Sequence, residues 1–527
     1  MRANMPNHKV IGKLMVICSL VMVRSLAVAG DNKNTTNNPP PKPAPVVRQA
    51  QPVPRPVQRP AVQPTRVQPG NPGVKPSTVP AGPHGLGPGT GPVYHPNGMA
   101  PTGGNRPPVG TGGPHGTPGA VASRPTPGGG HVDVGRNNQP LAYHGREGQE
   151  ARFGSGGGIR EIRDPKRGMV IQHGLRPGER RIESEQNGRR LVSTDPHRGY
   201  MERAYLHRNG HDYVQRTYWE HGRPYARVYR DHFYRGVHYY HYVPPYYYHP
   251  GFYGWAYEPW PAPVAYQWGW NIEPWYGYYG SYFAPAPIYP TASLWLTDFL
   301  LAENLKLAYE AKKEAEVNPQ TYQPGGPPPE GESSVAAPLS PEVKAAIQVE
   351  VSRQLADEEA EAKGSIPPVS IEAPPAALDP KQRLFVVSSN LAVSPEGGQE
   401  CELSGGDVIT RIDDTPDPEG KVRVSVLTSK QNDCSVGSMP KLEASDLQEM
   451  HNSFREQLDS GLKTLASNQG KGGLPSAPDT GTSPGEVPPP APDGNIDTRL
   501  QAQQKEATQT EEEVQQQVQT GQAPANP

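Results

Sequence analysis

The chain has little apolar material for its 527 residues, and this shortage limits its architecture. Hydrophobic residues make up 34% of it, below the roughly 45–50% of a globular domain, and the mean hydropathy is −0.72. The 58 glycines and 66 prolines favour extended or flexible backbone. Too little apolar surface is available to offset the entropy of ordering the whole chain. We therefore expect a mostly disordered chain with a few small folded regions.

Recognisable catalytic motifs are also missing. The sequence has no P-loop, no His-Glu-x-x-His and no Cys-x-x-Cys. Residues 481–485 formally match the Gly-x-Ser-x-Gly nucleophile elbow, but they lie in a proline-rich tail without the strand and helix that this motif needs. The sequence therefore predicts no catalytic or cofactor-binding residue. A hydrolase with carboxylates that converge only in three dimensions is the weaker alternative.

The 16 histidines do not follow a metal-binding pattern. Ten of them lie between His144 and His249, and a metal site needs several such side chains to converge. His238 and His241 are three apart in a predicted strand, so they should point to opposite faces. We expect sheet histidines that are hydrogen-bonded to tyrosines or carboxylates, and no metal ligands.

Cysteine is scarce as well, with three residues in the chain. Cys18 lies within residues 1–29, which are typical of a secretory signal peptide with cleavage after Ala29. Its apolar run is too short to span a bilayer, and no later stretch is long enough to do so. Export to the periplasm or cell surface would place Cys401 and Cys434 under oxidising conditions, where a disulfide is expected. Two free buried thiols are the alternative.

The formal net charge of −2 conceals an uneven distribution along the chain. Residues 1–297 carry 33 basic and 16 acidic side chains, whereas the remainder carries 18 basic and 37 acidic ones. The two halves could attract each other, or each could meet a different partner. The basic residues are spread over several segments and not concentrated on one face, so we expect no nucleic-acid partner.

Composition divides the chain into eight segments. The folded ones are predicted to be an aromatic-rich, all-β antiparallel meander, two amphipathic helices and a small β-barrel with a terminal helix. The segments in order are a signal peptide (1–29), a Pro/Gly-rich disordered spacer (30–157), the meander with a Tyr/Trp/Pro-rich arm (158–290), a helix (291–317), a linker (318–338), a second helix (340–363), the barrel (377–466) and a disordered Pro/Gln/Glu-rich tail (467–527).

The meander prediction rests on turns and alternation. Asn187-Gly188 and Asn209-Gly210 are strong hairpin signals, because both positions of a tight turn can adopt positive φ. Between such turns polar and apolar side chains alternate, and Val214, Arg216 and Tyr218 should share one face. We expect five or six strands within 158–243, with arginine planes stacked on tyrosine rings across strands.

The arm at 244–290 is unusually aromatic. Twenty-one of the 25 tyrosines lie between Tyr200 and Tyr289, and prolines in the arm disfavour regular helix or central strand. We expect an irregular segment draped over the meander, with its rings as core. The alternative is an exposed aromatic platform that stacks on a ligand, formed by Tyr253, Trp255, Trp260, Trp268, Trp270 and Trp275.

The helix at 340–363 begins with Ser340 and Pro341, which are typical of a helix N-terminus. Its apolar stripe could pair with another helix, with its own copy in a coiled coil, or lie in solvent. In the segment 377–466, Leu403-Ser404-Gly405-Gly406-Asp407-Val408-Ile409 resembles a strand opening of PDZ domains and of SH3-like barrels, and the order of elements favours the SH3-like barrel.

Over roughly residues 200–490 the chain resembles a group of uncharacterised exported bacterial proteins. They share a Pro/Gly-rich front, a Tyr/Trp-rich middle such as Gly254-Trp255-Ala256-Tyr257 and Pro259-Trp260-Pro261-Ala262-Pro263, and an acidic, Cys-containing end. This resemblance implies location and architecture and carries no activity. The resulting hypothesis is a non-catalytic envelope or surface protein that binds a glycan, wall polymer or protein. A self-associating structural or assembly factor is the alternative.

Overall fold

The computed structural model describes residues 117–522 except 176–177, 196–197, 221, 318–336, 365–372, 396–397 and 431–433. The predicted signal peptide with Ala29, most of the predicted spacer and nearly all of the linker therefore lie outside the described residues. Among the helices that are described, none combines the length and hydropathy needed to cross a membrane.

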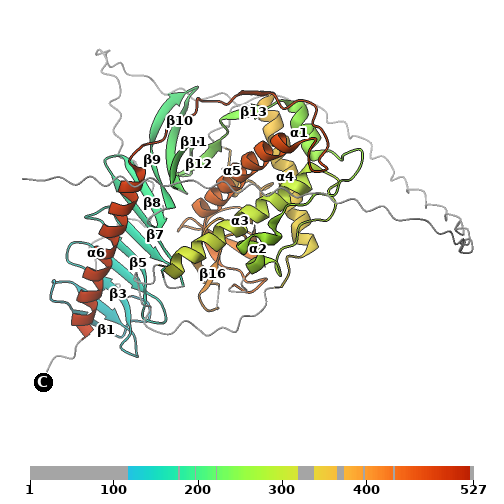
Figure 1. The fold of residues 1–527 in the computed structure, drawn as a ribbon. Coiled ribbons are helices and arrows are strands. Elements are labelled where there is room, and N and C mark those ends of the chain that lie inside the picture. The colour runs from blue at the N-terminus through green and yellow to red at the C-terminus, as the bar shows by residue number, and fades with distance from the viewer. Residues whose placement is uncertain are drawn as a thin grey trace, which may run out of the picture. The chain divides into compact units, whose positions relative to one another are not determined.

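Twelve consecutive strands form one antiparallel sheet in which sequence neighbours are also sheet neighbours (Figure 1). An antiparallel meander is thus confirmed, but the expected five or six strands were too few, and the sheet begins inside the predicted spacer. The strands are β1 (Ala122–Pro125), β2 (His131–Val134), β3 (Pro140–His144), β4 (Glu150–Phe153), β5 (Ile159–Asp164), β6 (Met169–His173), β7 (Arg180–Gln186), β8 (Arg189–Asp195), β9 (Arg198–Arg208), β10 (His211–Glu220), β11 (Arg223–Tyr234) and β12 (Val237–Val243).

Strands β1–β4 were not predicted, because each contributes few apolar side chains. Val132, Val134, Tyr143 and Ala151 are buried on one face of β2–β4, and tight glycine turns separate the strands. The expected hairpin turns are confirmed further along, where Asn209 and Gly210 have φ values of 51° and 79°. Positive φ at both positions matches the right-handed twist of the flanking strands.

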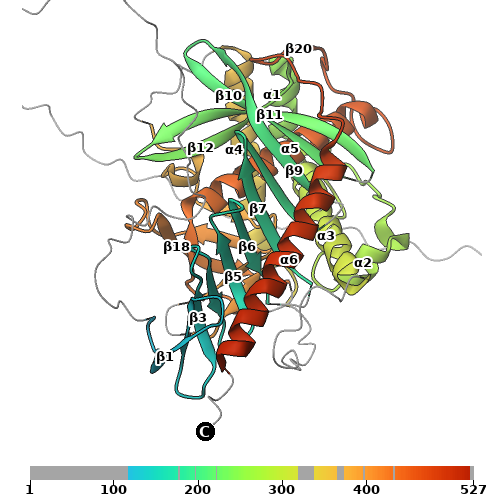
Figure 2. The same ribbon diagram turned by 90° about the vertical axis from the view of Figure 1, so that its left-hand side faces the viewer.

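A C-terminal helix, α6 (Ile496–Gln522), lies across the strands of this sheet (Figures 1 and 2). Its apolar stripe packs on the buried face of β2–β9, and the stripe consists of Ile496, Leu500, Ala507, Val514 and Val518. The prediction of a disordered tail at 467–527 is wrong for this helix. The stripe is thin and interrupted by glutamine and threonine, so the helix depends on the sheet for its stability.

The aromatic arm also differs from the prediction, because it folds into short helices. The helices α1 (Pro250–Tyr257) and α2 (Pro274–Tyr279), with the 3-10 turn η1 (Trp270–Ile272), replace the expected irregular arm. Proline is the first residue of both helices, a position where its missing N–H costs nothing. The arm packs against three longer helices and not over the meander. These helices are α3 (Ala292–Val317), α4 (Pro341–Ala362) and α5 (Ala444–Asn468).

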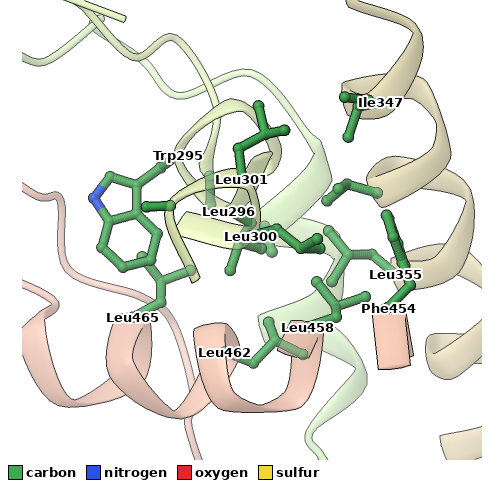
Figure 3. Packing of buried hydrophobic residues seen from close by; sticks show 14 of the residues in the cluster. Trp295, Leu296, Leu300, Leu301, Ile347, Leu355, Phe454, Leu458, Leu462 and Leu465 are labelled. Atoms are coloured by element: carbon green, nitrogen blue, oxygen red, sulfur yellow. The ribbon is translucent and has the colours of Figure 1, made fainter. Parts of the chain in front are cut away.

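Both predicted amphipathic helices are present. Ser340 caps α4 by accepting a hydrogen bond from the Val343 backbone N–H. The stripe of Ile347, Val351 and Leu355 is fully buried within the chain against α1 and α3. Of the three alternatives for this stripe, the structure therefore shows pairing with other helices of the same chain. Figure 3 shows this core, where Leu355 of α4 lies near Phe454 and Leu458 of α5, and Ile347 lies farther along α4.

The described residues of the C-terminal segment form no closed barrel, so the SH3-like prediction is not supported. A four-stranded sheet has the order β14-β17-β18-β19, and β15 pairs only with β16. Leu447 and Met450 of α5 pack in the same core as Phe385, Ile409 and Val424, so a helix covers the face that a barrel would close upon. The Cys401–Cys434 disulfide is present. The strands of this segment are β14 (Leu384–Val386), β15 (Leu391–Val393), β16 (Cys401–Leu403), β17 (Val408–Arg411), β18 (Lys421–Thr428) and β19 (Lys441–Glu443), and the 3-10 turn η2 (Ala376–Leu378) precedes them. Two further strands, β13 (Tyr246–Tyr248) and β20 (Thr482–Pro484), form a separate pair.

Candidate ligand-binding cleft

A large cleft lies between the twelve-stranded sheet, helices α3 and α5, and the region around β15. Its volume is about 2070 Å³. Ring faces and charged groups alternate along the part of the wall that belongs to β7–β12 and α5. The side chains that line this part of the wall include Arg181, Glu183, Arg190, Tyr200, Glu202, Tyr218, Tyr225, Arg227, Tyr240, Asp446, Glu449 and Glu456.

Strand register brings the aromatic wall together. Tyr218 of β10 lies opposite Tyr225 of β11 and Tyr200 of β9, and Arg216 lies opposite Arg227. The rings of Tyr218 and Tyr225 are stacked with centroids 5.2 Å apart, and the ring of Tyr200 is also 5.2 Å from that of Tyr218. The predicted shared face of Val214, Arg216 and Tyr218 is therefore confirmed by the register.

The guanidinium group of Arg216 contacts the rings of this wall. Its guanidinium carbon lies 4.8 Å from the ring centroid of Tyr200 and 4.1 Å from that of Tyr229. Its two terminal nitrogens donate to both carboxylate oxygens of Glu449 at 2.6 and 2.8 Å, and Nε donates to Glu202 at 2.6 Å. Bidentate, charge-assisted bonds of this kind fix orientation. The expected stacking of arginine on tyrosine across strands is confirmed here.

A second polar row runs beside this group. Tyr229 donates to Glu456, and its hydroxyl oxygen lies 2.6 Å from that of Tyr218. Tyr242 donates to Asp459 at 2.6 Å. Burial, reinforced by the negative charge of Glu456, raises the pKa of Tyr218 and Tyr229 well above the usual range. These phenols therefore stay protonated and act as donors at neutral pH.

The acidic partners come from one face of α5. Glu449, Glu456 and Asp459 are spaced by seven and three residues, a spacing that keeps side chains on the same side of a helix. They meet Arg216, Tyr229 and Tyr242 of the sheet. Other pairs between the basic and acidic halves are Arg160–Glu400, Arg167–Glu513, Arg180–Glu511, Arg203–Asp493 and Arg227–Glu456. The two halves of opposite charge thus contact each other.

Two carboxyls at the start of α5 have different environments. Burial raises the pKa of Asp446 to about 7, although Arg181 opposes this shift. Burial would also raise the pKa of Glu449, but the charge and hydrogen bonds of Arg216 outweigh it and hold the pKa below the ordinary value. The cleft therefore contains one carboxyl that is protonated in part at neutral pH beside one that is ionised.

The six residues of the predicted platform are mostly used for packing. Tyr253, Trp260 and Trp275 are buried, so they offer no ring face to a ligand. Trp255, Trp268 and Trp270 are half-buried against the same core. Trp268 is stacked between Trp270 and Trp295, with ring centroids 4.2 and 4.4 Å away. The rings that line the cleft therefore come from the sheet and not from these six residues of the arm.

Sequence reasoning missed the residues that organise the cleft. The acidic spacing on α5 and the alternating Arg/Tyr pattern of β9–β11 were both visible, but their meeting depends on a contact between segments more than 200 residues apart. The same reasoning also passed over His131, Asp133 and His144, which converge on β2 and β3. The predicted spacer covered those strands, so their side chains were not expected to converge.

No family model, curated protein or solved structure matches this chain. The resemblance to exported bacterial proteins therefore remains an expectation, and any functional argument depends on the chemistry of the cleft itself.

Proposed function

We propose that the protein is a non-catalytic, exported protein of the cell envelope or cell surface, and that its cleft binds a segment of a glycan or wall polymer. The observation that carries the proposal is the cleft of about 2070 Å³ with tyrosine faces on its sheet wall. Pockets for small molecules typically measure about 300–1,000 Å³. A cleft of this size suits several units of a chain-like ligand.

The lining chemistry favours a polar ligand of low charge. Tyr200, Tyr218 and Tyr225 provide neighbouring rings, which can stack on sugar rings while hydroxyls supply hydrogen bonds. Among the arginines that line the cleft, Arg190 is already paired with Glu183 and Arg227 with Glu456. A strongly anionic polymer would have to displace these carboxylates at a large cost. The Cys401–Cys434 disulfide supports an oxidising compartment and hence export.

The test is a pull-down of residues 30–527 with insoluble envelope polysaccharide and with a purified wall fraction. We use this long fragment because the sheet packs with α5 and α6. Tyr225→Ala removes one half-buried ring of the stacked pair that lines the cleft and should weaken retention about tenfold, in line with the loss of one stacking contact. Tyr225→Phe keeps the ring and should retain most binding.

Phe233→Ala is the matched control, because Phe233 lies on the same strand, is 52% exposed and does not line the cleft. It should bind as the unaltered chain does. Binding that Tyr225→Ala leaves unchanged would contradict the cleft as the site, and the absence of any binding to both fractions would contradict the ligand class.

A hydrolase acting on such a polymer is the second candidate, favoured by the divergent pKa values of Asp446 and Glu449. A protonated carboxyl beside an ionised one is the arrangement that glycoside hydrolysis uses. Glu449, however, places both oxygens on Arg216, so its carboxylate already has a structural role. Release of new reducing ends, abolished by Asp446→Asn, would establish the enzyme; no release supports binding alone.

A self-associating assembly role has less support. One of its expected surfaces was the apolar stripe of the 340–363 helix, and Ile347, Val351 and Leu355 are buried inside the chain. Light scattering of the 30–527 chain tests this role, because a lasting monomer would contradict it.

A further inference from the structure

Three potential metal ligands meet on adjacent strands near one end of the sheet. His131 and Asp133 are two apart on β2 and therefore share a face, and His144 of β3 lies directly opposite His131. The imidazole rings are stacked with centroids 4.8 Å apart. The Asp133 carboxylate lies 4.0 Å from Nε2 of His131 and 3.6 Å from Nε2 of His144. In the part of the chain that the structure describes, this is the one cluster of its kind.

The carboxylate at the centre is held in place. The Asp133 side chain is only 8% exposed, whereas the imidazoles of His131 and His144 are 49% and 36% exposed. Thr117 donates to Oδ2 of Asp133 at 2.5 Å and so fixes the carboxylate, whose Oδ1 faces Nε2 of His131 and whose Oδ2 faces Nε2 of His144. Ligands in metal sites commonly have such an outer partner, which fixes their orientation. A buried, oriented carboxylate beneath two accessible imidazoles differs from an ordinary solvated charge cluster.

We propose that His131, Asp133 and His144 bind one divalent transition-metal ion such as Zn²⁺. Zinc lies about 2.0–2.2 Å from nitrogen and oxygen ligands, so tetrahedral ligand atoms are about 3.3 Å apart. One ligand atom from each residue can be chosen so that all three lie within 4.8 Å of one another. The nearest approaches of the carboxylate are 4.0 Å from Oδ1 to His131 and 3.6 Å from Oδ2 to His144, so binding one ion requires small rotations of the side chains.

The donor set decides the class of metal. Two imidazoles with one carboxylate suit zinc, copper, nickel or iron(II), whereas calcium and magnesium prefer oxygen ligands throughout. Three protein ligands also leave at least one coordination position for water or for an anionic group. The ion would tie β2 to β3 on the face opposite Val132 and α6, where the chain has little apolar packing. The inference is independent of the cleft.

The test is calorimetric titration of the untagged 30–527 chain with ZnCl₂, followed by titration with CoCl₂ monitored by visible absorption. Residues 30–527 contain 15 of the 16 histidines of the chain, so the decisive result is the difference between variants. His144→Gln and His131→Gln should each weaken the tightest site about 100-fold or more and abolish its Co²⁺ absorption band. Thr117→Val, which removes only the outer partner, should weaken it about tenfold.

His207→Gln is the matched control. His207 is also an exposed strand histidine, and its Nδ1 lies 2.8 Å from Oδ1 of Asp212, but it belongs to no cluster of three ligands among the described residues. It should leave the affinity and the Co²⁺ band unchanged. His131 is exposed and His144 is half-buried, and thermal unfolding in EDTA verifies that each variant is folded. If His144→Gln binds as many ions as the unaltered chain with the same affinities, the proposed site does not exist.

Discussion

The tyrosines of strands β9–β12 and the rings around α3 belong to the same residue types but are held in opposite ways. In the sheet, Tyr229 and Tyr242 donate their hydroxyls to carboxylates of α5. Around α3, Trp295 is fully buried between aromatic and aliphatic side chains, and no described residue accepts a hydrogen bond from its indole N–H. One region is organised by charge and hydrogen bonding, the other by packing.

The difference follows from what each segment faces. The sheet strands supply arginines such as Arg216 and Arg227, which meet the acidic helix α5, so burial there requires paired charges. The arm meets leucines of α3 and α5, which need no polar partner. One polar chain does cross the packed region, because Trp268 donates to Tyr289 and Tyr289 donates to Asp298. Packing energy should therefore dominate around α3, and ion-pair geometry should dominate in the sheet.

The largest expected effect is in the packed region. Trp295→Ala leaves a cavity beside Trp268 and Phe299 and should lower the free energy of unfolding by about 4 kcal/mol. Urea unfolding monitored by circular dichroism measures this change. Ile272→Ala is the control, since Ile272 is 83% exposed in the same arm and should alter stability by about 0.5 kcal/mol or less. Equal losses in both variants would contradict a packed core around α3.

Arg216→Met tests the sheet. The substitution keeps much of the side-chain volume but leaves Glu202 and Glu449 facing each other without their cation, so we expect a loss of about 3 kcal/mol in urea unfolding. Adding Glu449→Gln should recover part of that loss, because it removes one uncompensated charge. A double variant no more stable than Arg216→Met would show that the arginine acts through ring packing, and the contrast between the regions would disappear.

Asp446→Asn tests how the stability of the region around the sheet and α5 depends on pH. The pKa of Asp446 is raised from 3.8 to about 7 in the folded chain, which therefore holds this proton more tightly than the unfolded chain does. Its stabilising contribution is present below about pH 4 and is lost as the pH rises towards 7. Since asparagine does not ionise, the variant should exceed the unaltered chain by about 2 kcal/mol at pH 8, after allowance for solvent in the cleft. At pH 4 the two should unfold alike, and an equal gain at both pH values would exclude titration as the cause.

Sequence patterns predicted local structure better than long-range arrangement. The Asn-Gly turns, the Ser340 cap and the alternating face of Arg216 and Tyr218 depend on neighbouring residues, and all three are confirmed. Helix α6 and strands β1–β4 were not predicted to fold because each is too polar to appear foldable alone; they bury apolar side chains against one another and against β5–β7. The closed barrel was wrong for a related reason, since α5 supplies Leu447 to that core.

The smallest predicted effect isolates one hydroxyl. Tyr242→Phe keeps the ring and removes the hydrogen bond to Asp459, whose pKa burial already raises to about 6. The unpaired carboxyl can take up a proton, which limits the loss to about 1 kcal/mol at pH 7. Tyr278→Phe, at a ring that is 47% exposed in the arm, should leave the urea midpoint unchanged. If the two variants lose equally little, hydroxyl pairing contributes nothing to the sheet, and its tyrosines are held by their rings, as the arm is.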